Sequence, residues 1–210
     1  MDWQAYLPFL SDAQAGQLTR AAELYRAANA RVNLISRTDI AHLEERHLLH
    51  SLLIGRYMGF GAGVRVLDLG AGGGLPGLPL ALAFPEAEFT LLDSTQKKLV
   101  AVGEIAQALG LQNLTTVWQR AEDHRARYDY VVGRAVAALP QFWSWAKPLL
   151  RCRGGLPLPG GVLYLKGGDL GNELAQIGRP HTVVPLYDWV PLPWYETKVL
   201  VYLDACSPNG

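Results

Sequence analysis

The stretch RVLDLGAGGGLPGLPLALAFPEAEFTLLDS, residues 65–94, constrains the fold more than any other part of the chain. Five glycines lie between positions 70 and 77, directly after an apolar run, and a second apolar run ends on Asp93. Short apolar runs bounded by turn residues are typical of buried strands, and glycine lets a backbone turn sharply and approach a ligand closely. The pattern predicts a strand, a glycine-rich turn, a helix and a second strand, which together begin a doubly wound α/β sheet.

The same alternation of strands and helices continues to the C-terminus. The predicted strands span residues 64–69, 88–93, 114–119, 128–135, 161–167, 181–189 and 198–205. The predicted helices span residues 76–84, 95–110, 139–150 and 169–178, with Gly110 ending the second of them. Such alternation implies a parallel sheet covered on both faces. The last two strands are too close for a helix between them, so we expect a hairpin and a reversed edge strand.

Residues 1–60 have a different sequence pattern, in which apolar residues recur every three to four positions. The segments DAQAGQLTRAAELYRAANARVNLI and DIAHLEERHLLHSLLIGRYM predict amphipathic helices, and Asp39 is expected to cap the second. GFGAG at residues 59–63 predicts a flexible joint. We therefore divide the chain into an N-terminal helical extension, residues 1–60, and a sheet domain, residues 61–210.

Bulk properties exclude several classes of protein. The 19 basic and 19 acidic residues cancel, so no global positive field draws in nucleic acid, and any such contact needs local patches. Cys152 and Cys206 lie far apart without metal-ligand spacing, which predicts two free thiols and no metal site. The N-terminus lacks a basic signal region and no apolar run reaches 18 residues, so we expect a cytoplasmic protein without a membrane segment.

The register of the glycines favours one class of nucleotide ligand. A dinucleotide site needs its first glycine directly after the strand, and that frame starts at Gly70 and puts Leu75 at its third glycine position. In register with the strand, the chain instead has the pattern D-x-G-x-G-x-G, from Asp68 through Gly70 to Gly74. This loop type is typical of S-adenosylmethionine-dependent methyltransferases. Asp93 is placed to accept hydrogen bonds from a ribose, or to cap the helix that follows it.

The motifs VLDLGAGGGLPGLPLA, LLDSTQKK, RAED, GRAVA and LKG occur in this order along the chain. Together with RVNLIS and ERHLLHSL near the N-terminus, they resemble the ribosomal RNA small subunit methyltransferase G family, also called glucose-inhibited division protein B. The resemblance runs from about residue 18 to residue 204. The Pro76-Gly77 pair after the glycine loop separates this family from other methyltransferases.

The resemblance implies a class I methyltransferase fold and methylation of N7 of one guanine in 16S ribosomal RNA of the small subunit. S-adenosylmethionine is the implied cofactor, no metal is expected, and we expect a monomer. Its implied cofactor contacts are Gly70, Gly72, Gly74, Leu75, Asp93, Ala121, Glu122 and Arg134. The residues implied to be catalytic are Arg134 and Lys166. Our candidates for contact with RNA are Arg46, Lys166 and Lys198. The chain departs from the usual family pattern at His50, Gly133 and Thr197-Lys198.

Other polar and aromatic residues have simpler interpretations. His47 lies on the apolar stripe of its helix and is expected in the core, as are the tryptophans of WSW at 143–145. The arginines of residues 119–128 are expected in a solvated loop, whereas Lys97 and Lys98 begin a helix close to the expected ligand edge.

The implied reaction makes small demands on side chains. Guanine N7 carries a lone pair and no proton, so it needs no general base, and positioning can contribute about 7–11 kcal/mol. Three alternatives stay open at this stage: a nicotinamide-dependent dehydrogenase, a methyltransferase of a small molecule, and a binding module that kept the fold without turnover.

Overall fold

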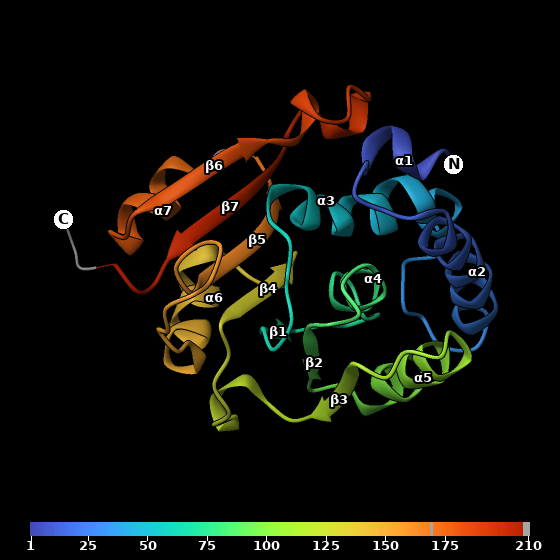
Figure 1. The fold of residues 1–210 in the computed structure, drawn as a ribbon, viewed down its shortest axis with the longest axis horizontal. Coiled ribbons are helices and arrows are strands. Elements are labelled where there is room, and N and C mark those ends of the chain that lie inside the picture. The colour runs from blue at the N-terminus through green and yellow to red at the C-terminus, as the bar shows by residue number, and fades with distance from the viewer. Residues whose placement is uncertain (169, 208–210) are drawn as a thin grey trace.

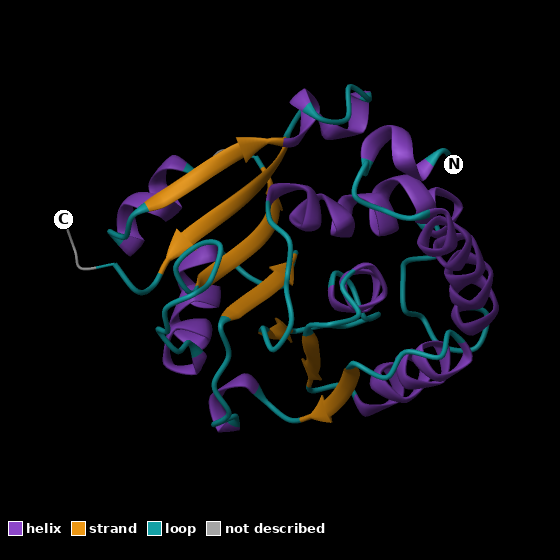
Figure 2. Ribbon diagram, viewed as in Figure 1, coloured by secondary structure: helices purple, strands orange, loops and turns teal. Residues whose placement is uncertain are grey.

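The computed structural model describes residues 1–168 and 170–207 of the chain (Figure 1). Seven strands form one sheet. They are β1 (Arg65–Leu69), β2 (Glu88–Asp93), β3 (Leu114–Trp118), β4 (Tyr130–Arg134), β5 (Gly161–Gly167), β6 (His181–Pro185) and β7 (Lys198–Asp204). The α-helices are α1 (Trp3–Tyr6), α2 (Asp12–Asn29), α3 (His50–Tyr57), α4 (Gly77–Ala83), α5 (Gln96–Ala108), α6 (Leu139–Ala146) and α7 (Gly171–Ile177). Figure 2 shows these helices on both sides of the sheet, which confirms the predicted α/β class.

The strand order is β3-β2-β1-β4-β5-β7-β6. β1 pairs in parallel with β2 and with β4, so the chain order reverses beside β1. In sheets of this kind, ligands bind at that point, beyond the carboxyl ends of the strands. β7 runs antiparallel to β5 and to β6, so the predicted hairpin is present. The reversed strand is β7, one place inside the sheet, and β6 forms the edge.

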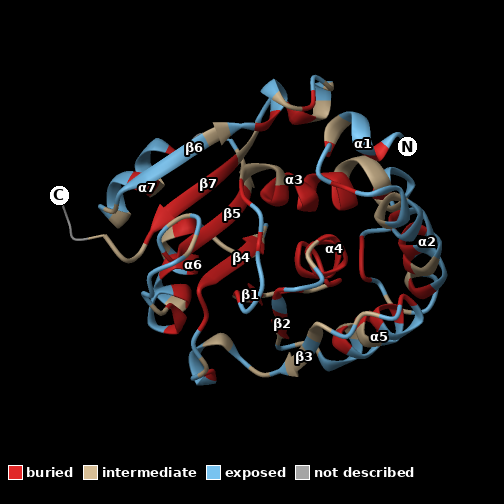
Figure 3. Ribbon diagram, in the orientation of Figure 1, coloured by how far each residue is buried: buried red, intermediate tan, exposed pale blue. Residues whose placement is uncertain are grey.

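Side chains along β1 alternate between the two faces of the sheet, as the pleat requires. Val66 joins the hydrophobic cluster formed with α2, α3, α4 and α5. Leu67 and Leu69 join the other cluster, formed with α6 and α7. Asp68 falls on the same face as Val66, and it is fully buried. Figure 3 shows the central strands and α4 as buried, while the outer faces of α2 and α5 are exposed.

The N-terminal extension packs on the sheet domain and does not stand apart from it. α2 begins with a capping box between Ser11 and Gln14, and its buried side chains belong to the same cluster as those of α4 and α5. The boundary at residue 60 stays a prediction, since this cluster is continuous across it.

The second predicted N-terminal helix differs in detail from the structure. The segment divides into the 3-10 turn η1 (Ile40–His42), the π-helical η2 (Leu43–Leu49) and α3. Asp39 forms no side-chain cap, because its carboxylate instead contacts His47. Short π-helical segments often occur at functional sites.

Several boundaries in the sheet domain shift by a few residues. Pro148 lies in the 3-10 turn η4 (Lys147–Leu149), so α6 ends before it. β6 stops at Pro185, where the 3-10 turn η5 (Leu186–Asp188) begins, and β4 begins two residues later than predicted. Residue 169, the start of the last predicted helix, lies outside the described residues. Gly110 has a φ of 72° just after α5, as its predicted role at the helix end requires.

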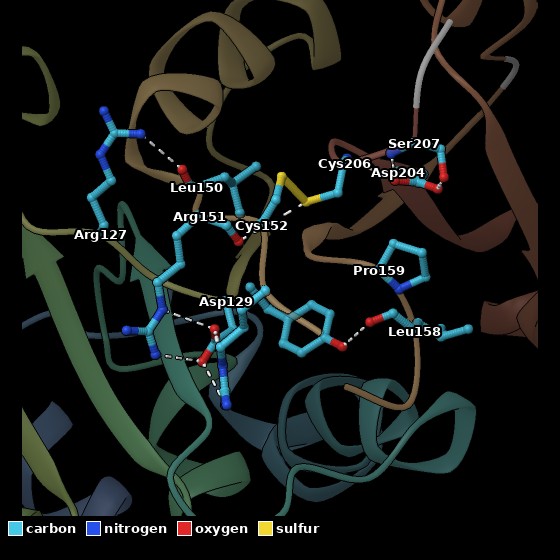
Figure 4. The surroundings of a disulfide bond; sticks show 12 residues. Arg127, Asp129, Leu150, Arg151, Cys152, Leu158, Pro159, Asp204, Cys206 and Ser207 are labelled. Carbon is cyan, nitrogen blue, oxygen red and sulfur yellow. Dashed lines mark hydrogen bonds and ion pairs between the residues drawn. A yellow bond between two sulfur atoms is a disulfide. The ribbon is translucent and has the colours of Figure 1, made fainter. Parts of the chain in front are cut away.

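The prediction of two free thiols is wrong. Cys152 and Cys206 form a disulfide, with their Cα atoms 5.4 Å apart and a sequence separation of 54 (Figure 4). Pairing of β5 with β7 brings these distant segments together, since Gly161 lies opposite Asp204 in the sheet. Sequence spacing alone carries no sign of that pairing.

Candidate active site

A cavity of about 500 Å³ lies beyond the carboxyl ends of β1, β2 and β4, at the predicted switch point. This volume falls in the range of small-molecule sites. Its lining comes from residues 69–73, 92–94, 119–122 and 134–136, together with Leu34, Leu75, Lys98 and Trp145. Glu122 belongs to the 3-10 turn η3 (Ala121–Asp123). Segments far apart in sequence therefore meet around one hollow.

The glycine loop forms one wall of the cavity and is fixed to β2. Gly70, Gly72 and Gly74 all have positive φ values, between 53° and 80°, which side-chain-bearing residues rarely adopt. The amide of Gly72 donates to Asp93 Oδ2 at 2.8 Å, and the amide of Thr95 donates to Asp93 Oδ1 at 2.7 Å. Each carboxylate oxygen of Asp93 keeps further acceptor capacity toward the cavity that it lines.

The glycines of the loop have different functions. A Cβ atom placed on Gly72 would meet no heavy atom closer than 4.0 Å, so its α-carbon faces open space. A Cβ on Gly74 would lie 2.7 Å from a methyl group of Val102 and 3.1 Å from the Tyr25 hydroxyl. Gly74 is absent from the cavity lining. Close packing against α5 and α2 therefore explains this glycine, and its predicted contact with the ligand stays a prediction.

Asp68 lies buried beneath the loop. Its Oδ2 accepts a 2.7 Å hydrogen bond from the amide of Gly77, at the first residue of α4, whereas its Oδ1 has no partner among the described residues. Burial raises the pKa of Asp68 to about 7, against the opposing effects of the Gly77 hydrogen bond and of Arg134. The nearby Tyr25 hydroxyl is also buried, and nothing in residues 1–168 and 170–207 forms a hydrogen bond with it. Polar groups left unpaired in this way are uncommon and point to a functional region.

Arg134 connects the cavity to the π-helical segment. Its Nη1 donates to the carbonyl of Arg46 at 3.0 Å, and its Nη2 lies 2.8 Å from His47 Nδ1. Since a guanidinium only donates, Nδ1 must accept, and His47 Nε2 then donates to Asp39 Oδ2 at 2.9 Å. Burial, followed by the charge of Arg134, lowers the pKa of His47 to about 4. His47 is therefore a neutral, buried histidine, as expected, and it orients the arginine that lines the cavity.

The predicted site residues divide into two groups. Gly70, Gly72, Leu75, Asp93, Ala121, Glu122 and Arg134 all line the cavity. Arg46, Lys166 and Lys198 do not.

The three residues outside the cavity have intramolecular partners. Lys166 forms an ion pair with Glu173 of α7. Lys198 Nζ lies 4.7 Å from the ring centroid of Trp194, in the 3-10 turn η6 (Pro193–Tyr195), and Arg46 lies 3.7 Å from Asp39.

The structure adds residues that the sequence did not single out for the cavity. Arg120 lines it, although the arginines of that segment were expected in a solvated loop. Trp145 also lines it, whereas Trp143 is buried in the core as predicted. Leu34 comes from the segment after α2, and no local motif marks it. Only the position of Arg120 as the first residue of the RAED motif offered a signal.

Two of the departures from the family pattern have structural explanations. A Cβ atom on Gly133 would lie 2.5 Å from the ring of Phe142, so a serine there requires a different packing of α6. His50 is buried, and neither ring nitrogen has a hydrogen-bond partner in the part of the chain that the structure describes. Its ring packs edge-on against Trp194, with 5.1 Å between the ring centroids. Burial and the charges of Arg134 and Lys198 hold the pKa of His50 well below its usual range.

Among the described residues, no three histidine, cysteine or acidic side chains gather closely enough to hold a metal ion. No helix in those same residues has both the length and the apolar character for crossing a membrane.

Among the solved structures similar to this one are methyltransferases with low sequence identity. An S-adenosylmethionine-dependent methyltransferase from Aquifex aeolicus aligns with 80% of this chain and 98% of its own, with a TM-score of 0.58 and 15% identity. A 16S rRNA N2 methyltransferase from T. thermophilus, solved in complex with AdoMet and guanosine, covers 81% of this chain and 43% of its own. Its TM-score is 0.53 at 20% identity. These similarities support the class I methyltransferase fold.

Sequence comparison is more specific. The profile of the family described as rRNA small subunit methyltransferase G matches residues 14–183. Ribosomal RNA small subunit methyltransferase G of Christiangramia forsetii is 42% identical over 94% of this chain and 93% of its own length. The protein of the same name from Cytophaga hutchinsonii is 41% identical, over 96% of this chain and 98% of its own length. With a profile match over most of the chain and identities above 40%, this chain belongs to the ribosomal RNA small subunit methyltransferase G family.

Proposed function

We propose that this protein transfers a methyl group from S-adenosylmethionine to N7 of one guanine in 16S ribosomal RNA of the small subunit. The observation that carries the proposal is the glycine loop fixed to Asp93 at the wall of a cavity of about 500 Å³. Membership of the family gives the class of reaction and of substrate.

The residues around the cavity fit this cofactor. The open space over Gly72 admits close approach of a ligand to the backbone. Asp93 and Glu122 offer acceptors for hydroxyl and amino groups, and Arg134 offers unused N–H donors for a carboxylate. The residues that would hold the cofactor are Gly70, Gly72, Leu75, Asp93, Ala121, Glu122 and Arg134, while Gly74 supports the loop from behind. When bound, the cofactor supplies a methyl group that its sulfonium already activates.

The chemistry of the lining suits an acceptor that needs no base. None of the described residues that line the cavity is a histidine. His47, the nearest candidate, has both ring nitrogens engaged, by Arg134 and by Asp39. Guanine N7 reacts through its lone pair and loses no proton, so the protein needs only to position it and exclude water.

Arg134 and Lys166 take different parts in the proposed reaction. Arg134 lines the cavity and is oriented by His47, so it is placed to bind cofactor and to face the incoming base. Lys166 lies outside the cavity and is paired with Glu173, so as a proposed RNA contact it would have to exchange that carboxylate for a phosphate. Arg46 and Lys198 are proposed RNA contacts at the same edge, near Trp194.

We further propose a cytoplasmic monomer. The proposed substrate, a ribosomal particle, is found in the cytoplasm. Light scattering at micromolar concentration tests the first statement, with the mass of one chain as the expected result.

The proposed activity is tested with tritium-labelled S-adenosylmethionine and small subunits that lack the modification. We expect label to enter 16S RNA with wild-type protein and not with the Gly72→Val variant. In that variant, a β-branched side chain occupies a position with φ of 53°. Transfer of label to a small metabolite, with none to RNA in free or particle form, would contradict the proposal.

A further inference from the structure

A second hollow, of about 780 Å³, lies outside the cofactor cavity. It runs between the C-terminal end of α2, residues 30–41 and the start of α5. α2 and α5 pack side by side in Figure 1. Four cationic residues line it, and no acidic residue is among the described residues of its lining: Arg26, Arg31, Arg37 and Lys97. We refer to it as the basic groove.

Two of the four cations are free to bind a ligand. Arg26 pairs with Glu44 at 2.5 Å, and Arg31 pairs with Glu104 at 2.9 Å. Arg37 and Lys97 are exposed, and within residues 1–168 and 170–207 neither forms an ion pair or side-chain hydrogen bond. In a chain whose formal charges cancel, the groove is therefore a local concentration of positive charge.

The basic groove adjoins the cofactor cavity along two walls. Asn33 lines the groove and Leu34 lines the cavity. Likewise Lys97 lines the groove, while Lys98 lines the cavity. The Leu34 carbonyl also packs against the glycine loop, since a Cβ atom on Gly73 would lie 2.7 Å from its oxygen. A chain lying in the groove therefore passes directly beside the site of methyl transfer.

We propose that the sugar-phosphate backbone of the substrate RNA lies in the basic groove, with Arg37 and Lys97 contacting phosphates. This inference rests on the proposed function and adds the path of the substrate to it. RNA fits the groove because a run of phosphates matches several cations spaced along a channel, and because the adjoining cavity can receive a base. Arg37 and Lys97 are also less engaged than Arg46, Lys166 and Lys198, each of which already has a partner within the chain.

The test compares two double variants that change net charge by the same amount. Arg37→Glu with Lys97→Glu reverses the free cations of the groove. Arg20→Glu with Lys147→Glu is the control, because both residues are exposed and neither lines the groove or the cavity. Lys147 follows α6, which runs back toward the opposite edge of the sheet. Binding to unmodified 16S RNA is measured by fluorescence anisotropy, and methylation is measured with small subunits.

We expect the groove variant to raise the Kd for RNA and the KM for subunits about tenfold or more, through the loss of two phosphate contacts. The Kd for S-adenosylmethionine should stay unchanged, and the control should match wild type. Replacing both residues by glutamine should make the log–log dependence of RNA affinity on salt shallower by about 1.4, since each single-strand contact contributes about 0.7.

Other outcomes overturn the inference in distinguishable ways. If the wild type methylates 16S RNA and the groove variant does so with unchanged KM, the groove is not the path of the substrate, and the proposed function stands. If methylation of subunits falls but affinity for free RNA is unchanged, the groove contacts a ribosomal protein instead. If the wild type methylates no RNA, the proposed function fails, and equal RNA binding by the two double variants would then also reject the groove.

Discussion

Two buried aspartates at opposite ends of the central strands show how differently the two edges of this sheet are built. Asp129, just before β4, accepts hydrogen bonds from the guanidinium group of Arg151 (Figure 4). It also accepts hydrogen bonds from the amide of Arg65 and from the guanidinium group of Arg153. Burial alone would raise its pKa, but these bonds outweigh burial and hold the pKa of Asp129 at about 2. Asp68, near the end of β1, has one hydrogen bond, an unpaired oxygen and a pKa of about 7.

The environments of these two aspartates indicate that the amino edge of the sheet serves stability and the carboxyl edge serves function. At the amino edge, Asp129 ties β1, β4 and the segment after α6 together, and the Cys152–Cys206 disulfide lies beside it. At the carboxyl edge, beneath the glycine loop that lines the cavity, Asp68 Oδ1 and the Tyr25 hydroxyl find no hydrogen-bond partner among the described residues. Unsatisfied buried groups lower stability, and proteins keep them mainly where binding or catalysis requires them.

The largest effect on stability is expected at the disulfide. Replacing Cys152 and Cys206 by serine releases a loop that spans 54 residues, which should lower the free energy of unfolding by about 4 kcal/mol. Urea denaturation of variant and oxidised wild type measures the difference. Cofactor affinity should not change, because the disulfide lies at the amino edge. Matching stabilities would mean that the bond does not restrain the unfolded chain.

Asp129→Asn should lower the free energy of unfolding by about 3 kcal/mol at pH 7, because two arginines lose their anionic partner. A carboxyl with a depressed pKa stabilises the fold above its unfolded pKa near 4. That contribution is lost as the pH falls toward 2. The difference in free energy of unfolding between variant and wild type should therefore become smaller below pH 4. If this difference did not depend on pH, the loss of stability would come from altered packing and not from the lost charge.

Asp93→Ala tests the carboxyl edge, and its effect is measured as a change in cofactor affinity instead of stability. Loss of its hydrogen bonds should weaken S-adenosylmethionine binding by about 2 kcal/mol, measured by calorimetry. Asp123→Ala is the matched control, since it removes a nearby exposed acid that does not line the cavity. Equal affinities in the two variants would remove Asp93 from the site.

Asp68→Asn should have the smallest effect and the opposite sign. A buried carboxyl with a raised pKa does not lower the free energy of unfolding at a pH below its unfolded pKa near 4. Its penalty grows as the pH rises toward 7, so the neutral amide should stabilise the protein by about 1 kcal/mol at pH 8. Thermal unfolding at pH 5 and pH 8 measures this difference. A variant less stable than wild type at pH 8 would show that the ionised acid is satisfied.

The sequence predicted best those features that depend on neighbouring residues. The predicted strand, glycine loop and helix around residues 65–84 agree with the structure to within about a residue. The spacing of apolar residues and the backbone preferences of glycine and proline determine such elements locally. The features that it missed depend on distant partners. The disulfide needs the register of β5 with β7, and Glu173 holds Lys166 only once α7 has folded back.

In the candidate site, too, the residues in local motifs were predicted, and those positioned by distant contacts were not. Gly70, Asp93 and Arg134 sit in motifs at strand ends, and the topology brings such ends together whatever lies between them. Leu34 and the basic groove come from an irregular segment after α2, whose path is set by packing against the glycine loop. No periodic pattern encodes that path.

The identity of the methylated atom tests the central claim most directly. Small subunits that lack the modification are incubated with the wild-type protein and S-adenosylmethionine, and the 16S RNA is then digested and its nucleosides are analysed by mass spectrometry. The account predicts 7-methylguanosine, formed at a rate that stays flat as the pH rises from neutral, because N7 loses no proton. N2-methylguanosine or a 2′-O-methyl nucleoside, formed at a rate that climbs through the pKa of a base, would contradict it.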